Sequence, residues 1–438
     1  MKHFRLTWNS FLTGTLLLTI TGVLSRIIGF FYRIFLSRTI GAEGLGIYQL
    51  IFPVLTLCIS FTSSGIQTSI SKYVAQEQGR NEKHAGIRFL YVGLFLSLLL
   101  SVIVCIFLFM QADYIAVKIL GESRCRDLIR IMAYSLPFCS IHSCINGYYY
   151  GRKKTALPSI TQLTEQIVRV GSVYIIYLIY TEKNLALTPS IAVWGIVCGE
   201  IASMLISVTA IRFSKYSGSL IGALKKLTRF CIPLTANRVT INLFVSIEAI
   251  LIPANLKLFG YSNTDALCVF GILTGMAMPM ILFPNVLTSS VSVLLLPTIS
   301  EAQAACNQKL IARAIKKTIE YCMILGLFST LFFLLTGNFI GQVVFQNTLA
   351  GVFITTLSWI CPFLNLATTL TSILHGLGKA TCAFVLNLTG CLIRIFFIFI
   401  LVPIYGIRPY LYGMLVSQLF VSASALFVIM RFRNDCRN

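Results

Sequence analysis

The sequence predicts an all-α, polytopic membrane protein of about 12 transmembrane helices, arranged as two six-helix lobes around a central cationic cavity. Hydrophobic residues make up 57% of the 438-residue chain and charged residues only 11%, a balance that soluble domains do not have. Apolar runs of about 20 residues, the length that crosses a bilayer, recur along the whole chain. Five arginines lie inside these runs: Arg26, Arg33, Arg169, Arg238 and Arg394.

Each apolar run bounded by polar or charged residues is interpreted as one span. The first follows Lys2 and Arg5 as a signal peptide would, but no small-residue cleavage site follows it, so it is predicted to be retained. In the ninth, Gly337–Phe345 either extends the helix or forms a short outer one. The predicted spans are Phe11–Leu36, Gly46–Ser71, Phe89–Met110, Leu128–Tyr150, Leu157–Ile179, Ala186–Ile211, Phe230–Ala254, Leu267–Ile299, Thr318–Leu335, Val352–Leu374, Thr381–Val402 and Tyr410–Met430.

The longest polar break in mid-chain divides the spans six and six. It predicts an N-terminal lobe over 1–211, a cytoplasmic linker over 212–229 and a C-terminal lobe over 230–438. The lobes also share a pattern, since Pro137, Gly151, Lys154 and Arg169 recur 225 residues later as Pro362, Gly376, Lys379 and Arg394. This register indicates a duplication, and internal repeats of this kind place the substrate site between the halves.

The net charge of +21 suggests nucleic acid in a soluble chain, but here the basic residues follow membrane topology. Outside the five embedded arginines, one alternate set of loops and termini carries 22 lysines and arginines and the other set only 8. The richer set is predicted to be cytoplasmic, with both termini inside and no nucleic-acid partner. Within it, Ser300–Gln303 with Arg313, Lys316 and Lys317 is interpreted as an amphipathic helix touching anionic lipid headgroups.

The embedded arginines are expensive, because a guanidinium at the bilayer centre costs about 2.5–3.5 kcal/mol even on the lenient insertion scale. They must therefore face acidic partners or a water-filled cavity inside the bundle. Embedded acids are few: Glu165, Glu200, Glu248 and Glu320. Because arginine outnumbers acid, the excess positive charge predicts an anionic substrate, and guanidinium forks suit phosphate oxygens.

The candidate substrate-binding residues lie on four spans. Arg26 and Arg33 are seven residues apart on one face of the first span, which is interpreted as a cavity wall rather than a tight helix contact. Glu165 and Arg169, four apart, either pair with each other or meet substrate. Arg238 and Asn242 share a face of the seventh span, and Glu248 lies too far along that helix to neutralise Arg238. Arg394 has no acidic neighbour in its own helix.

Other chemistry is not predicted. There is no Walker loop, no Ser/His/Asp grouping and no large outer loop to hold a catalytic domain, so no catalytic residue is assigned and the chain is not expected to be an enzyme. The cysteines show no metal-ligand spacing and are interpreted as small buried thiols. His142 and His375 lack carboxylate or cysteine partners at ligand spacing and are interpreted as packed or interfacial. Neither a metal nor a cofactor is assigned. The energy source is expected to be a coupling ion or the membrane potential.

Several segments resemble the stage V sporulation protein B family of polysaccharide-export proteins. They are Ser25–Phe30 with Arg33 and Arg38, Gly41–Tyr48, Gly147–Gly151, Glu165–Arg169, then Pro233, Arg238, Asn242 and Glu248, and Pro297–Glu301. The resemblance covers essentially the whole chain. It implies the two-lobed fold of the multidrug/oligosaccharidyl-lipid/polysaccharide (MOP) exporter superfamily, which includes the MATE transporters and the lipid II flippase MurJ. Members often carry fourteen spans, and MurJ-type chains have an Arg-Asp pair where this chain has Tyr32-Arg33.

The resemblance implies a flippase in the bacterial cell membrane. Its substrate would be an undecaprenyl-pyrophosphate-linked saccharide, either a peptidoglycan precursor or another envelope glycan, and envelope-glycan synthesis proteins are possible partners. One alternative within the same fold is a cation-coupled drug antiporter, which needs an embedded acid, typically in the first helix; this first helix has none. Another alternative is a non-transporting scaffold for envelope or spore assembly, which would gain nothing from embedded arginines.

Overall fold

The computed structural model describes residues 2–79, 86–211, 219–289, 292, 295, 299 and 308–435, and within these it contains helices and no strand. Eleven described helical segments, some made of several consecutive elements, are long and apolar enough to cross a membrane. The all-α, polytopic prediction is therefore confirmed. The difference from twelve lies in α8 (Ala156–Glu182) at the fifth predicted span. This helix has 27 residues but is not among the eleven, because the polar band over 161–166 and Arg169 lowers its hydropathy.

The described helices form two compact units. Unit 1 is Met1–Tyr32 with Ile47–Ser246, and unit 2 is Arg33–Gly46 with Ile247–Asn438. All three boundaries fall inside helices: α1 (Lys2–Thr39), α2 (Gly41–Leu50) and α10 (Leu220–Phe259) each contribute one part to each unit. The lobe boundaries at 211 and 230 stay a prediction. Of the linker predicted over 212–229, residues 212–218 lie outside the described residues, and residues 220–229 form the beginning of α10.

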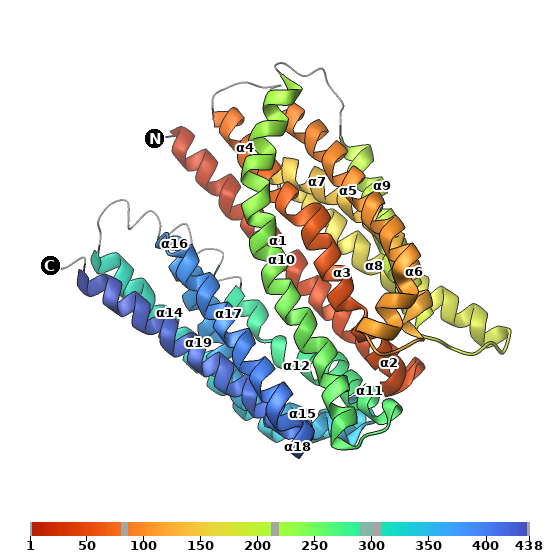
Figure 1. The fold of residues 1–438 in the computed structure, drawn as a ribbon. Coiled ribbons are helices and arrows are strands. Elements are labelled where there is room, and N and C mark those ends of the chain that lie inside the picture. The colour runs from red at the N-terminus through yellow and green to blue at the C-terminus, as the bar shows by residue number, and fades with distance from the viewer. Residues whose placement is uncertain are drawn as a thin grey trace. The chain divides into compact units, whose positions relative to one another are not determined.

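Unit 1 is built around α7 (Ser135–Gly151), which packs against α4 (Gly65–Gly79), α5 (Ile87–Tyr114) and α9 (Ser190–Ala210) (Figure 1). In turn, α8 packs along α9. The remaining helical segments are α2 (Gly41–Leu50), which begins in unit 2, α3 (Phe52–Ile59), the π-helical turns η1 (Ser60–Ser64) and η2 (Ile115–Ile119), and α6 (Cys125–Ala133).

Close backbone approach explains the glycines of the α7 segment. A Cβ atom at Gly147 would lie 2.6 Å from the Gln67 carbonyl oxygen, and one at Gly151 would lie 2.6 Å from that of Ser71. Small residues let membrane helices pack backbone to backbone, where lipid gives no hydrophobic drive for association. Near the end of unit 1 that is predicted to face the cytoplasm, a hydrophobic core joins α4, α5 and α7. It includes Ile66, Ile70 and Phe89.

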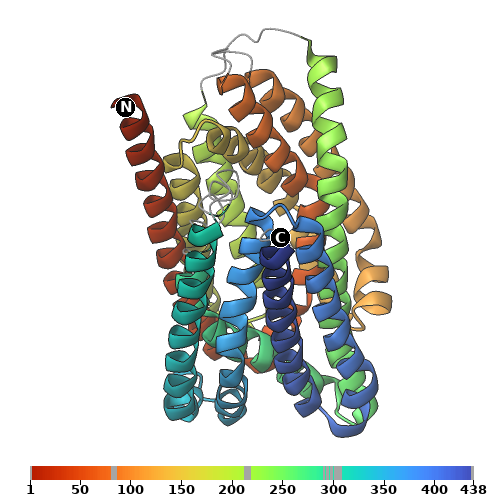
Figure 2. The same cartoon turned by 90° about the vertical axis from the view of Figure 1, so that its left-hand side faces the viewer.

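Unit 2 is a row of long helices, and Figure 2 shows α14 (Gln308–Phe339), α16 (Cys361–Gly376), α19 (Arg408–Asp435) and α17 (Ala380–Phe396) side by side in that order. Shorter elements complete it: α11 (Asn263–Gly271), η3 (Ile272–Ala277), α12 (Met278–Leu282), η4 (Ile340–Val344), α15 (Thr348–Leu357), η5 (Ser358–Ile360), η6 (Phe397–Leu401) and α18 (Val402–Tyr405). The segment Gly337–Phe345 therefore extends the ninth span through η4.

Helix boundaries follow the predicted register. The helix ending at Gly151 and the helix ending at Gly376 are 225 residues apart, and α9 and α19 end at Ala210 and Asp435 with the same offset. Each repeat also breaks before its proline, between α6 and α7 and at η5, where a proline in the first helical turn removes no hydrogen bond. The two-fold relation between the halves stays a prediction.

The amphipathic segment is described only in part. Ser300–Gln303 lies outside the described residues, whereas Arg313, Lys316 and Lys317 are exposed in the first turns of α14. Ile311 and Ile315 of the same turns are buried in the unit 2 core with Leu370 and Leu374. The amphipathic character is present in this part, and lipid contact stays a prediction.

Candidate functional site

The predicted pair on α8 forms within one helix of unit 1. An Arg169 Nη2 nitrogen bonds to Glu165 Oε1, and the two side chains are only 16% and 19% exposed. Helix α9 covers them through small residues, since a Cβ atom at Gly199 would lie 2.8 Å from the Glu165 carbonyl oxygen. Of the two interpretations open from the sequence, the self-neutralised pair is the one the structure contains.

The other strong pair joins residues 146 positions apart in unit 2. Arg394 of α17 donates to Glu248 of α10 through both branches, Nε to Oε1 at 2.7 Å and Nη2 to Oε2 at 2.9 Å. The Tyr410 hydroxyl donates to the same Oε1 at 2.8 Å, and Arg394 Nη1 donates to the Ser417 hydroxyl at 3.1 Å. Two parallel charge-assisted bonds in a buried setting neutralise this arginine and fix its geometry. All three guanidinium nitrogens of Arg394 therefore donate to protein groups. Its contact with substrate stays a prediction.

Within the described part of the chain, Arg238 and Asn242 hydrogen-bond to neutral groups, all in unit 1. Arg238 Nη1 donates to the Ser64 carbonyl oxygen at 3.0 Å and Nη2 to the Thr68 hydroxyl at 3.2 Å. Asn242 donates to the Ser60 hydroxyl, one turn earlier on η1. These contacts hold the first part of α10 on η1 and α4. Among the described residues no carboxylate meets Arg238, so its positive charge is held in place without being neutralised.

The two arginines of α1 belong to different units. Arg33 Nη1 donates to the Thr274 carbonyl oxygen of η3 at 3.2 Å, in unit 2. Arg26, in unit 1, is exposed, and within the described part of the chain it has no hydrogen bond or ion pair. Its neighbour Ser25 is buried, and the Ser25 hydroxyl has no partner there either. Arg26 is thus the embedded arginine that is most available to an external anion.

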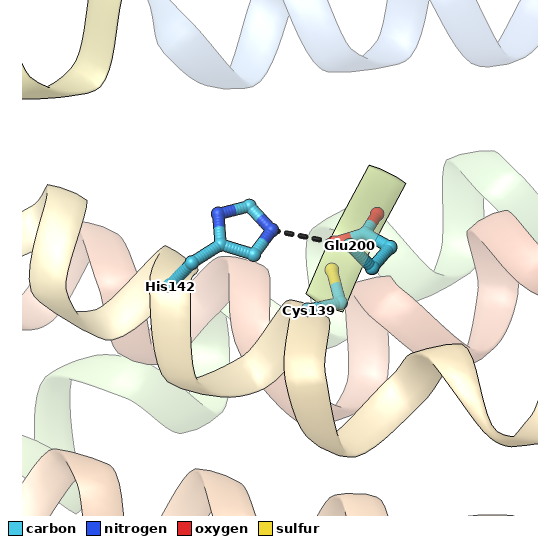
Figure 3. Close-up of side chains that lie close together, drawn as sticks. All are labelled: Cys139, His142 and Glu200. Carbon is cyan, nitrogen blue, oxygen red and sulfur yellow. Dashed lines mark hydrogen bonds and ion pairs between the residues drawn. The ribbon is translucent and has the colours of Figure 1, made fainter. Parts of the chain in front are cut away.

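Two residues gain roles that the sequence did not indicate. Arg38, counted there as a loop residue, donates to the carbonyl oxygens of Val343 and Val344 at 2.8–3.2 Å and so caps the end of η4, where unpaired carbonyls collect negative charge. His142 is buried as predicted, but its Nε2 lies 2.7 Å from Glu200 Oε2 of α9 (Figure 3). That partner is 58 residues away, so no local spacing could reveal it.

The fold defines a class of protein: a polytopic membrane protein with the fold of the MOP-superfamily transporters. The fold matches that of an inward-facing MATE multidrug-resistance transporter with a TM-score of 0.75 at 15% identity, covering 95% of each chain. It matches the inward closed lipid II flippase MurJ equally, at 16% identity over 95% of this chain and 87% of that one.

The particular family follows from the sequence comparison. The chain belongs to the polysaccharide biosynthesis protein family, whose model matches residues 11–303. Two similar proteins come from Bacillus subtilis (strain 168). Stage V sporulation protein B is 26% identical over 90% of this chain and 78% of its own length, and the lipid II flippase MurJ is 23% identical over 88% and 76%. The predicted resemblance is confirmed.

Proposed function

We propose that the protein is a flippase that moves an undecaprenyl-pyrophosphate-linked saccharide across the bacterial cytoplasmic membrane by alternating access. The observation that carries the proposal is the state of Arg26 and Arg238. Both lie in membrane-spanning helices of unit 1, and neither meets a carboxylate among the described residues. Positive charge that is held in a membrane span without a carboxylate partner is suited to binding and releasing an anionic substrate.

Three further observations support a phosphate-bearing lipid. The family is named for polysaccharide biosynthesis, and one relative is a lipid II flippase. Guanidinium groups form two parallel bonds to phosphate oxygens, which an ammonium cannot do. In this proposal Arg26 and Arg238 of unit 1 bind the anionic head. Cytoplasmic termini and an ion or the membrane potential as energy source complete it.

The cation-coupled drug antiporter is less well supported. Three of the four predicted embedded acids are committed to protein partners: Glu165 to Arg169, Glu248 to Arg394 and Glu200 to His142. The fourth, Glu320, is exposed and lies 3.8 Å from Lys316. A cationic drug would have to displace one of these partners, whereas an anionic headgroup needs only to meet Arg26.

The test is complementation of a bacterial strain depleted of its envelope-glycan flippases. Arg26→Ala and Arg238→Ala should each abolish growth, because loss of one partner of a desolvated charge pair costs about 2–5 kcal/mol. Lys replacements should restore growth only in part, since the charge returns without the fork. Arg431→Ala, an exposed arginine at the end of α19, is the matched control.

Membrane abundance must be measured in the same cells. Arg26→Ala should be as abundant as wild type, because that side chain makes no described contact. If Arg26→Ala and Arg238→Ala were fully active at normal abundance, the proposal that these arginines bind an anionic substrate would be wrong, and their role would be structural. Resistance to cationic dyes conferred by the wild-type chain would favour the antiporter instead.

A further inference from the structure

Three side chains with metal-ligating atoms converge inside unit 1. Cys139 and His142 lie one turn apart on α7, and Glu200 faces them from α9 (Figure 3). The Cys139 sulfur, a ring nitrogen of His142 and a carboxylate oxygen of Glu200 all lie within 4.8 Å of one another. The three residues are buried, at 5%, 8% and 6% exposure. In Figure 3 the imidazole points at the carboxylate with the thiol beside it.

We infer that Cys139, His142 and Glu200 form a binding site for a divalent transition-metal ion of the zinc type. Zinc takes thiolate, imidazole and carboxylate ligands in tetrahedral geometry, and three protein ligands with one further oxygen is a common set. The second carboxylate oxygen of Glu200 or a water molecule supplies the fourth position. The interpretation that His142 has no cysteine partner at ligand spacing is wrong, because Cys139 lies three residues before it on the same helix face. The third ligand could not be found from spacing, since it comes from a helix 58 residues further on.

Charge balance permits a metal ion in place of protons. Glu165 is neutralised by Arg169, and the buried Glu200 carboxylate has His142 Nε2 as its partner at 2.7 Å, with a proton in the hydrogen bond between them. A divalent ion bound to the Cys139 thiolate, the Glu200 carboxylate and a neutral His142 gives a site with no net charge, which suits a membrane interior. On binding, the thiol proton and the proton shared between His142 Nε2 and Glu200 leave to solvent, as metal binding requires.

The surroundings include a polar group that orients the histidine. The Asn146 side-chain amide lies 3.5 Å from His142 Nδ1 and also bonds to the Thr161 hydroxyl. With the amide turned so that its oxygen faces the ring, Asn146 accepts the Nδ1–H and leaves Nε2 for the metal; nitrogen and oxygen of an amide differ only by this assignment. Partners of this kind fix the tautomer of metal-bound histidines.

The experiment uses the full-length protein purified in detergent under reducing conditions and titrated with Co²⁺ as a spectroscopic probe. We expect one Co²⁺ per chain, with a thiolate-to-cobalt charge-transfer band that Zn²⁺ displaces. Cys139→Ser should remove the band, and His142→Gln and Glu200→Gln should weaken binding at least tenfold. Cys144→Ser is the matched control, because Cys144 is a buried thiol on the same helix that bonds instead to the Gly93 carbonyl oxygen.

A second measurement covers variants that fold poorly. Zn²⁺ should raise the unfolding temperature of the wild-type and Cys144→Ser proteins and leave that of Cys139→Ser unchanged. Wild-type protein that binds no Co²⁺, or a thiolate band that survives in Cys139→Ser, overturns the metal site. The cluster would then be a His142–Glu200 pair that holds a proton.

Discussion

At the scale of single residues, the embedded arginines divide by the partners they have. Arg169 and Arg394 are paired with carboxylates, whereas among the described residues Arg238 bonds to a carbonyl and a hydroxyl and Arg26 is exposed. The sequence could predict the first pairing because Glu165 is four residues away on the same helix. It could not predict the second, since the partner of Arg394 lies in another helix and only the tertiary fold brings Glu248 to it.

The Glu248–Arg394 pair gives the first residue-scale prediction. Glu248→Gln or Arg394→Ala leaves a buried charge without its partner, which costs about 3–5 kcal/mol in other proteins. We expect little folded protein and a lower unfolding temperature, measured by size exclusion and thermal unfolding in detergent. The double variant Glu248→Gln/Arg394→Gln should lose less than the two single losses added together. Additive losses would show that the residues do not act as a pair.

The Glu165–Arg169 pair gives a contrasting prediction about activity. Glu165→Gln should reduce the amount of folded protein more than it reduces activity per folded molecule, because Glu165 serves Arg169 and not the substrate. Complementation divided by membrane abundance measures this. Loss of specific activity at normal abundance would move Glu165 into the substrate site. Arg26→Ala is the internal reference, because it is expected to lose specific activity at normal membrane abundance.

At the scale of helices, apolar length and polar breaks were enough to predict nearly every element. The exception is α8, which is not among the eleven candidate spans. Its polar residues form the Glu165–Arg169 pair and the contact with α9, and they lower the hydropathy of the helix. Packing partners were beyond the sequence: Gly147 and Gly151 are visible as small residues, but only the fold shows that α4 lies against them. The same holds for Gly46, where a Cβ atom would lie 2.1 Å from the Leu267 carbonyl oxygen of α11.

These contacts make a helix-scale prediction. Gly147→Ala adds a methyl group against a backbone oxygen that cannot turn aside, and overpacking of this kind costs about 1–3 kcal/mol. We expect a clearly lower unfolding temperature in detergent. Gly171→Ala on α8 is the matched control, since nothing lies within 4 Å of its added Cβ and helix propensity favours alanine by about 0.5–1 kcal/mol. Equal stability of the two variants would contradict the α4–α7 packing.

At the scale of the whole molecule, the membrane orientation rests on the asymmetry of the basic loops. Single cysteines placed at Lys153 and Lys316, on a background without reactive cysteines, should be shielded from an impermeant reagent added outside intact cells. Cysteines at Lys183 and Ser262 should be labelled, because those residues lie in the opposite set of loops. Labelling at Lys316 from outside would reverse the orientation and with it the assignment of the repeats.

The exchange of helix segments between the two units has a consequence for how the chain is made. Residues 33–46 leave the ribosome some two hundred residues before Ile247, where the rest of unit 2 begins, and residues 219–246 arrive after the other helices of unit 1. Unit 1 therefore cannot be finished when the N-terminal half of the chain has been translated, and unit 2 needs residues 33–46 from that same half. Two fragments divided after Ile211 should each be incomplete alone and should recover a folded protein only when they are produced together in the same cell.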